Sequence, residues 1–361
     1  MYHRIPPPPD FSQNNINLNI GEKSIPYIPY EFLNEWLKDK YYDYILVSGN
    51  ENYVLDNLKK LGIEKRRIFN MASTFSNTPL HLTYHTRLIR QIMSNLSSYV
   101  TLFVGSSYTR DSVDLTCYDL PAVSCSSSSQ DLYYSYKYVK FLLSKSNNNF
   151  KYVMIELSPY SFHYDLSKSN ESYIIPGYYL AFKDVHNFYI SAEELDIIFN
   201  EQYLKLFETF EKINYPFDLD LNDLYKWKQV NNHPMNVIDR FVARERAEIW
   251  NHKRFPDTVA ENVKILNECI QFCHKNNVIP TIVIYPKSYM YRKFFSKQML
   301  DEFYYILNGI KMKYKLNVLD YLEWTGVDYN DFYNVDHLNA NGSKKISKVI
   351  NSYIMRNYTK N

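Results

Sequence analysis

The chain has 361 residues, of which 36 are Tyr and 21 are Phe but only 8 are Gly and 4 are Cys. Its 41 basic and 39 acidic residues give a net charge of +2, so the concentrated basic face typical of nucleic-acid-binding proteins is not expected. No glycine-rich loop of the kind that holds a nucleotide phosphate occurs. Composition therefore excludes the common nucleotide-binding classes, and the length predicts two domains or one domain with a large insertion.

The cysteines and histidines predict neither a disulfide framework nor a metal site. Four Cys in a chain of this length do not form such a framework, and Cys269 and Cys273 lie four residues apart on an apolar helical face typical of core packing. His81 and His85 share that spacing but lack a nearby third ligand. The first residues lack a signal-peptide pattern, and the longest apolar runs have the length of a strand. We therefore expect a cytoplasmic protein with no transmembrane segment.

Residues 1–95 are expected to form a tail and a small Rossmann-like module. Residues 1–20 begin with a Pro run followed by Asn-rich sequence, which is typical of an extended tail. Residues 71–95 predict a connection with some helix. Between these segments, a strand, a helix and a strand predict a parallel βαβ unit at residues 44–47, 54–61 and 67–69.

Residues 96–361 are expected to form an α/β domain. Short apolar runs alternate with stretches in which apolar residues recur at helical spacing, so we predict a flavodoxin-like doubly wound parallel sheet. Residues 159–255 interrupt the alternation with aromatic, mostly helical sequence, which predicts an insertion. Thr258 and Glu261 have the spacing of a capping box and predict that a helix begins there. The expected strands are residues 100–104, 121–123, 152–156, 281–285 and 316–320.

Polar residues follow several of these strands, where a parallel sheet places its ligand site. Ser106 and Ser107 follow the first strand, residues 124–130 follow the second, and residues 331–342 follow the fifth. A serine hydroxyl is a poor nucleophile until a base takes its proton, and His337 is a base that works at neutral pH. The sequence therefore predicts a nucleophilic serine site at this edge.

Two of these motifs resemble those of the SGNH (GDSL-like) hydrolase superfamily. One is Gly105-Ser106-Ser107 after a strand, and the other is Asp336-His337-Leu338-Asn339 with Gly342. The resemblance covers roughly residues 96–358 and is closest to the bacterial branch associated with surface polysaccharides, which includes acyl-transfer proteins. It implies that Ser107 is the nucleophile, with its backbone N–H in the oxyanion hole, and that His337 is the general base.

The chain departs from the family pattern in two places. The family acid usually stands three residues before the His, where this chain has Asn334, so Asp336 and Asp331 are alternatives. An amide orients the imidazole but does not stabilise the imidazolium, and in a serine protease the Asp-to-Asn change lowers kcat by about 10⁴. The oxyanion Gly and the Gly-x-Asn-Asp block are also absent, which leaves backbone N–H groups or the side chains of Ser126 and Gln130 as donors.

Other residues at the same edge are candidates for contact with substrate. Arg110, three positions after the nucleophile, either holds a carboxylate, phosphate or sugar substituent or pairs with Asp111 or Asp114. Glu156 follows the third strand, and Lys287 follows the fourth. Aromatic residues of the insertion either stack on a sugar or, as is commoner, pack in the core. These are Tyr160, Phe162, Tyr164, Tyr173, Tyr178, Tyr179, Trp227 and Trp250.

The resemblance implies a serine esterase or O-acyltransferase that acts on an acylated carbohydrate through an acyl-Ser107 intermediate. This chemistry requires no metal or nucleotide cofactor. A catalytically inactive SGNH-fold protein that binds a glycan or takes part in an assembly is the alternative, which Asn334 favours. A third and weaker possibility is a sugar-nucleotide site on the N-terminal module.

Overall fold

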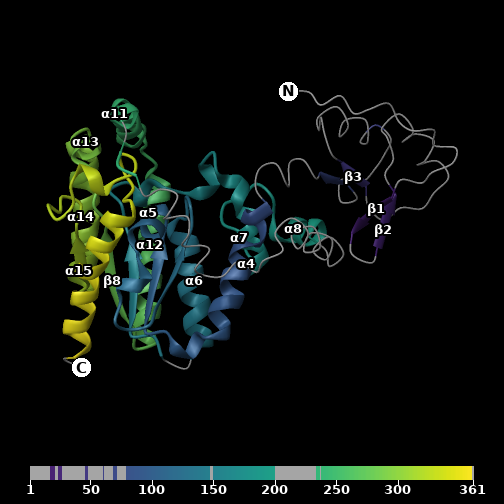
Figure 1. Ribbon diagram of the computed structural model, residues 1–361, viewed down its shortest axis with the longest axis horizontal. Helices are drawn as coiled ribbons and strands as arrows, with labels where there is room; N and C mark the ends of the chain where they lie inside the picture. Colours follow the sequence, from purple (N-terminus) through teal and green to yellow (C-terminus); the bar gives the residue numbers. More distant parts are fainter. Residues whose placement is uncertain are drawn as a thin grey trace. The chain divides into compact units, whose positions relative to one another are not determined.

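The structure is a computed structural model that describes residues 17–20, 23–26, 45–47, 60, 68–70, 79–146, 149–199, 233–235 and 237–359. Figure 1 shows the described helices and strands along the chain. The chain divides into two compact units, residues 1–84 with 190–218 and residues 85–189 with 219–361.

Among its described residues, the first unit contains two pairs of short strands. β1 (Asn17–Ile20) and β2 (Lys23–Pro26) pair antiparallel, so the last residues of the expected extended tail form a strand. β3 (Ile45–Val47) and β4 (Ile68–Asn70) pair in parallel, as predicted for residues 44–47 and 67–69. Most of the helix expected between them lies outside the described residues. The unit also includes α8 (Ala192–Ile198), which begins at a capping box formed by Ser191 and Glu194.

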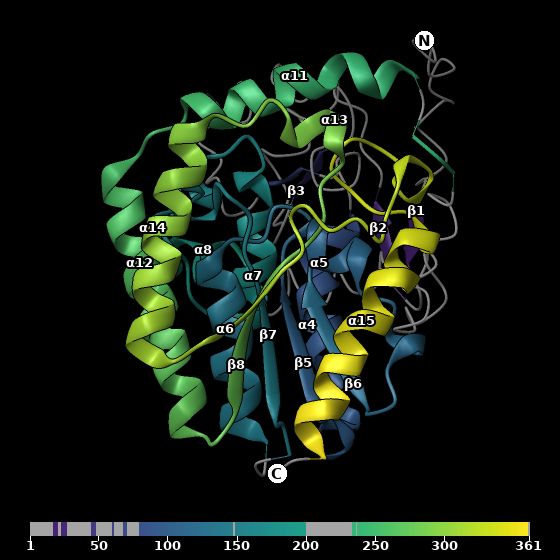
Figure 2. The same ribbon diagram turned by 90° about the vertical axis from the view of Figure 1, so that its left-hand side faces the viewer.

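The second unit is built on a five-stranded parallel sheet, which confirms the predicted flavodoxin-like arrangement. The strand order is β6-β5-β7-β8-β9, and in Figure 2 strands β8, β7, β5 and β6 follow one another across the sheet. β5 and β7 are buried along their whole length. Most of their residues are apolar, which suits strands of a sheet that helices cover on both sides. The strands are β5 (Thr101–Gly105), β6 (Ala122–Ser126), β7 (Tyr152–Glu156), β8 (Ile279–Ile284) and β9 (Asn317–Asp320).

Two sets of helices cover the sheet. α12 (Pro256–Lys275) packs against α6 (Leu132–Lys145) and α14 (Lys297–Tyr314), and α15 (Ala340–Tyr358) packs against α5 (Ser107–Ser112). The other α-helices described here are α4 (Pro79–Ser94), which begins in the first unit and ends in the second, α7 (Ile175–Phe182), α11 (Val237–His252) and α13 (Tyr289–Arg292). Short 3₁₀ helices are η3 (Leu96–Ser98), η4 (Leu115–Cys117), η5 (Ser161–His163), η6 (Leu166–Lys168), η7 (Ser172–Ile174) and η8 (Tyr329–Asp331).

The capping box predicted at Thr258 is not the start of a helix. α12 begins two residues earlier, with Pro256 in its first turn, where the missing N–H of proline leaves no bond unmade. Thr258 is instead a buried residue of the helix, and its hydroxyl accepts a hydrogen bond from Lys168 Nζ. Proline at the first helical position therefore outweighed the Thr and Glu spacing.

Tyrosine fills much of the core, which accounts for part of its abundance. His85 stacks on Tyr178 and bonds to the hydroxyl of Tyr138, so it packs in the core and is not set up as a metal ligand. All four cysteines are free, and Cys269 and Cys273 are buried as predicted. In the part of the chain that the structure describes, the largest fully buried side chains are Tyr134, Tyr138, Tyr152, Tyr178, Tyr179, Tyr291, Phe103, Phe150, Phe162 and Phe303.

The aromatic residues of the insertion mostly pack inside the protein. Tyr160 and Phe162 are buried beside the sheet helices, and Tyr178 and Tyr179 are fully buried, whereas Tyr173 is exposed. Trp227 lies outside the described residues. Tyr160 stacks on Trp250, with 4.0 Å between ring centroids, so these two rings mainly contact each other. Core packing, the commoner role for such residues, therefore accounts for most of this set.

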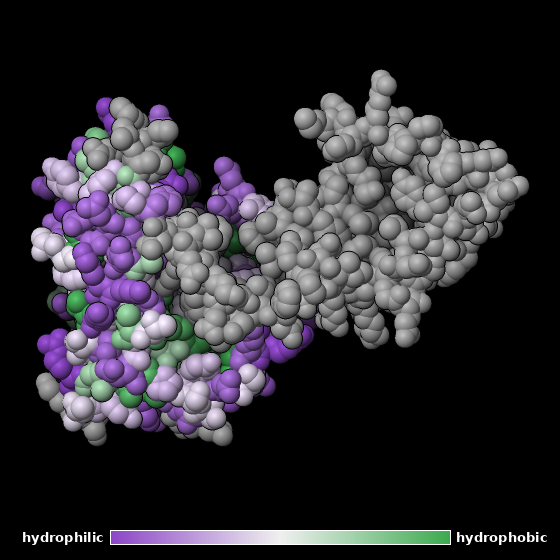
Figure 3. All heavy atoms as spheres, in the orientation of Figure 1, coloured by the Kyte–Doolittle hydropathy of each residue, from purple (hydrophilic) through white to green (hydrophobic). Residues whose placement is uncertain are grey.

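One face of the second unit shows a mainly polar surface where its residues are coloured in Figure 3. In Figure 3 the coloured residues of the visible face are mostly hydrophilic, with hydrophobic residues scattered among them. Among the described residues, none of the helices combines the length and the apolar character needed to cross a membrane.

Candidate active site

The turn between β5 and α5 positions Ser107 at the carboxyl edge of the sheet. Gly105 has a φ of +157°, and a Cβ there would lie 2.3 Å from Thr109 Oγ1 and 2.5 Å from Glu156 Cβ. Ser106 caps α5, since its hydroxyl accepts from the Tyr108 N–H. Glu156 Oε2 accepts hydrogen bonds from both the N–H and the hydroxyl of Ser106, each at 2.7 Å. Glu156, a predicted substrate contact, thus lies behind the turn and anchors it.

The loop before α15 brings His337 to the same edge. Asn339 caps α15 by accepting from the N–H groups of Asn341 and Gly342. A Cβ at Gly342 would lie 2.3 Å from the Asp331 carbonyl oxygen, so only glycine allows this close approach. The loop is further closed by an isolated bridge between Phe332 and Leu338.

Ser107, His337 and Asp336 form a hydrogen-bonded chain. Ser107 Oγ lies 2.8 Å from His337 Nε2. On the other side of the ring, Nδ1 lies 3.0 Å from Asp336 Oδ1 and 3.1 Å from Asn334 Oδ1. When Nε2 accepts the serine proton, Nδ1 carries a hydrogen that these oxygens accept. The arrangement has the contacts that a hydroxyl nucleophile, its base and an orienting group need.

The three candidates for the acid have different roles in the loop. Asn334 Oδ1 also accepts from the backbone N–H groups of Asp336 and His337, at 3.1 and 2.9 Å, so it folds the turn. Asp331 does not meet the ring; its carboxylate accepts from Lys345 Nζ and from the Asp328 N–H. Asp336 is the residue that brings a negative charge to the imidazole.

Asp336 is buried and holds several donors at once. Its Oδ1 accepts from Arg246 Nη1 at 2.6 Å, in addition to His337, and its Oδ2 accepts from the Tyr108 hydroxyl at 2.9 Å. Burial by itself raises the pKa of Asp336, but the charges of His337, Arg246 and Lys287 outweigh it and hold that pKa well below its usual range. Asp336 therefore stays ionised well into the acid range.

The segment after β8 clamps the backbone next to His337. Ser288 Oγ donates to the Val335 carbonyl oxygen at 2.5 Å, and Lys287 Nζ donates to the Asp336 carbonyl oxygen at 3.3 Å. Lys287 also lies over the Tyr108 ring, 2.6 Å from its centroid. Burial lowers the pKa of Lys287 to about 7, against the opposing effect of the nearby carboxylates. This lysine lies at the strand end where the sequence placed it.

Arg110 forms an ion pair on the neighbouring face of the site. Its Nε and Nη2 donate to the two carboxylate oxygens of Asp111, at 2.7 and 3.0 Å, and its Nη1 donates to Ser128 Oγ. Tyr333 donates to Asp111 as well, and its ring stacks on His337. Burial raises the pKa of Asp111, but the hydrogen bonds and positive charge of Arg110 lower that pKa by more. The pKa of Asp111 therefore lies below the usual value of an aspartate. Of the alternatives for Arg110, the structure shows the pair with Asp111.

The predicted oxyanion side chains are hydrogen-bonded to other groups of the protein. The Ser126 and Ser124 hydroxyls lie 2.8 Å apart, and both side chains are buried. Gln130 Nε2 donates to the Cys125 carbonyl oxygen, and Gln130 Oε1 accepts from the Tyr178 hydroxyl. Backbone N–H groups, among them that of Ser107 at the start of α5, are thus the donors that this edge offers most directly.

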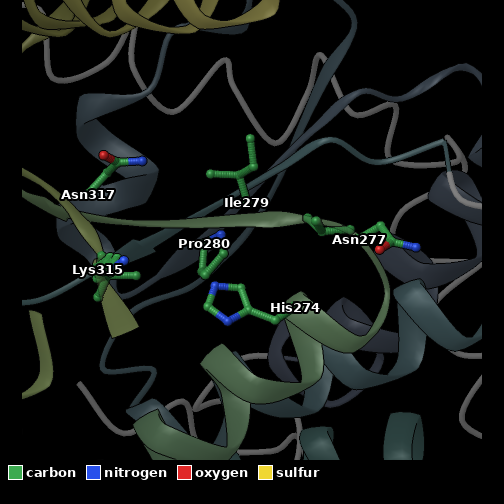
Figure 4. A pocket seen from close by; sticks show the side chains of 8 residues that line it. His274, Asn277, Ile279, Pro280, Lys315 and Asn317 are labelled. Atoms are coloured by element: carbon green, nitrogen blue, oxygen red, sulfur yellow. The ribbon is translucent and has the colours of Figure 1, made fainter. Parts of the chain in front are cut away.

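The described residues include two further features, a cluster of possible metal ligands and a hollow. Asp131, Asp165 and His186 each offer one ligand atom within 4.8 Å of the others. Both carboxylates already accept backbone N–H hydrogen bonds, and Lys168 Nζ lies 3.2 Å from Asp165 Oδ2. A hollow of about 430 Å³, shown in Figure 4, is lined by His274 and the first residues of β8 and β9. It therefore lies at the opposite edge of the sheet from Ser107.

Comparison with known proteins gave no family assignment: no family model matches the sequence, and no curated protein matches it either.

Sequence reasoning missed two residues of the site. Tyr108 carries no signal beyond its place after Ser107. Arg246 lies 90 residues before Asp336 in the chain, in the segment that interrupts the α/β alternation, and nothing in its local pattern distinguishes it.

Proposed function

We propose that this protein is an SGNH-like serine esterase or O-acyltransferase that acts on an acylated carbohydrate. The observation that carries the proposal is the hydrogen-bonded chain from Ser107 through His337 to Asp336 at the carboxyl edge of the sheet. The carbohydrate substrate, a surface polysaccharide or its precursor, rests on the resemblance of the two motifs to the polysaccharide-associated SGNH branch.

In the proposed reaction, Ser107 Oγ attacks the ester carbonyl while His337 Nε2 takes the hydroxyl proton. The C–O bond to the sugar then breaks, and His337 returns the proton to the departing sugar oxygen. Water or an acceptor hydroxyl next attacks the acyl-Ser107 ester with His337 again as base, the bond from Ser107 Oγ to the acyl carbon breaks, and His337 returns the proton to Oγ. Asp336 stabilises the imidazolium that forms in each half of the cycle, and the Ser107 N–H binds the oxyanion.

A fluorophosphonate probe tests the nucleophile directly, because it reacts with an activated serine and needs no knowledge of the natural ester. We expect labelling of the intact protein at Ser107, located by mass spectrometry of the labelled peptide. Ser107→Ala and His337→Ala should each abolish labelling. Ser352→Ala is the matched control, because Ser352 is exposed on α15 and its hydroxyl donates to the Lys348 carbonyl oxygen of the same helix, and it should keep labelling.

A catalytically inactive glycan-binding protein is the second candidate. Asn334 at the family acid position favours it, as do the hydrogen bonds that already occupy the side chains of Ser126 and Gln130. Absence of labelling in a protein that unfolds cooperatively would contradict the enzyme and favour this alternative. Glycan binding that persists in Ser107→Ala would then be the positive evidence for it.

A further inference from the structure

One oxygen of Asp336 is shared between the Arg246 guanidinium and the His337 ring. Oδ1 accepts from Arg246 Nη1 at 2.6 Å and from His337 Nδ1 at 3.0 Å. The other oxygen, Oδ2, is bonded to the Tyr108 hydroxyl, which in turn accepts from the Tyr160 hydroxyl. Both oxygens of the carboxylate are therefore occupied before the imidazole becomes charged.

Sharing weakens the interaction that a catalytic histidine normally receives. A carboxylate favours the imidazolium because the opposite charges attract each other. The Arg246 guanidinium attracts the same oxygen and repels the positive charge that develops on His337. Both effects disfavour the protonated ring, so they make His337 a weaker base and, once it is protonated, a stronger acid toward the leaving oxygen.

Arg246 differs from the other charges around this ring. The groups that face His337 are Asp336, Tyr108, Tyr333 and Asp111. Those that face Asp336 in addition are Lys287, Tyr160 and Tyr291. Most of these groups are buried. The Arg246 side chain is 44% exposed and comes from α11, outside the α/β alternation. Its charge can be removed without leaving a large cavity, which makes its effect measurable.

We propose that Arg246 is a positioning residue of the acyl-transfer site, which holds Asp336 Oδ1 and thereby limits how strongly Asp336 stabilises protonated His337. The proposal deepens the esterase function proposed above and rests on it. Its consequence is that the negative charge of Asp336 is divided between Arg246 and the His337 ring.

The test compares Arg246→Gln and Arg246→Lys with a control, Arg244→Gln. Arg244 lies on the same helix, is 71% exposed, and pairs with Glu248 at 3.8 Å. The first readout is the titration midpoint of the His337 ring, followed by NMR of ¹³C-labelled histidine in the Ser107→Ala background, with the peak assigned by His337→Ala. The second is the pH at which fluorophosphonate labelling falls to half on the acid side.

Removing the guanidinium should move both midpoints upward by about one pH unit in Arg246→Gln. Arg246→Lys retains the charge and should restore most of the original midpoint, and Arg244→Gln should shift it by less than about 0.3 unit because a solvent-exposed charge is screened. An unchanged midpoint in Arg246→Gln, or an equal shift in Arg244→Gln, would overturn the proposal. The ring titration needs no activity, so it decides the role of Arg246 even if no labelling occurs.

Discussion

At the scale of single residues, the site separates two tasks that one aspartate usually performs. Asn334 folds the turn, because its side-chain oxygen accepts two backbone N–H groups, and Asp336 supplies the charge. An Asp three residues before the His would do both. Here the residue next to the His turns back to the ring, and Lys287 and Ser288 hold its backbone in that conformation.

This separation predicts different results for two substitutions. Asp336→Asn should lower the rate of acyl chemistry by about 10³ to 10⁴, because the imidazolium loses its counter-charge. Asn334→Ala should lower the rate by less than about tenfold and mainly destabilise the loop, by about 1 kcal/mol, since Asp336 still holds the ring. Labelling rates together with thermal unfolding measure both. A rate loss in Asn334→Ala as large as in Asp336→Asn would show that the amide is the essential partner.

The sequence located this site only in part. Ser107 and His337 were predicted because each lies in a short motif at a strand end or before the last helix. The choice among Asp331, Asn334 and Asp336 could not be made, because it depends on how the loop folds back. Arg246 was out of reach for another reason: its contact with Asp336 spans 90 residues and is made by tertiary packing alone.

At the scale of elements, the alternation of apolar strands and amphipathic helices was enough to predict the parallel sheet. Strand ends and helix starts depend on finer balances. Pro256 and not Thr258 begins α12, and β1 and β2 pair in a stretch whose Pro- and Asn-rich neighbourhood suggested an extended tail. A strand buried on both faces is marked in the sequence by several consecutive apolar residues. The start of a helix depends on a single capping residue, so it is harder to predict.

The turn from β5 to α5 is the element that positions Ser107, the proposed nucleophile. Gly105→Ala should destabilise the protein by about 2 to 4 kcal/mol, because the new Cβ meets Thr109 and Glu156 and the backbone at φ +157° disfavours a side chain. It should also reduce labelling of Ser107. Urea denaturation and probe reaction measure the two effects.

Gly309 provides the control for that experiment. It is exposed within α14, and a Cβ there meets nothing within 4 Å. Gly309→Ala should therefore raise stability by up to about 1 kcal/mol and leave labelling unchanged. Equal losses of stability in the two alanine variants would rule out a steric requirement for glycine at position 105.

At the scale of the whole molecule, buried Lys287 makes stability depend on pH. Its pKa of about 7 lies far below the value near 10.5 of a solvated lysine, so unfolding takes up a proton between these two pH values. The wild-type protein should then gain stability relative to Lys287→Met as the pH rises from about 7 toward 10, by an amount on the order of a few kcal/mol.

Urea denaturation at pH 6, 8 and 10 measures this difference, with Lys311→Met as the control. Lys311 is exposed on α14, and its replacement should change stability equally at each pH. A stability difference between Lys287→Met and the wild type that is the same at all three pH values would mean that Lys287 keeps its proton in the folded protein.

The position of Asp336 directly before His337 also affects how such sites are recognised. Side chains of consecutive residues in extended backbone point to opposite sides, so Asp336 reaches the ring only because the backbone turns, and Lys287 and Ser288 hold that turn. A sequence motif that requires an acidic residue three positions before the His does not match this chain. A three-dimensional template built on the distances from the serine oxygen to the ring and from the ring to the carboxylate would match this site. Such a template would group proteins whose sites share a geometry but whose sequences differ.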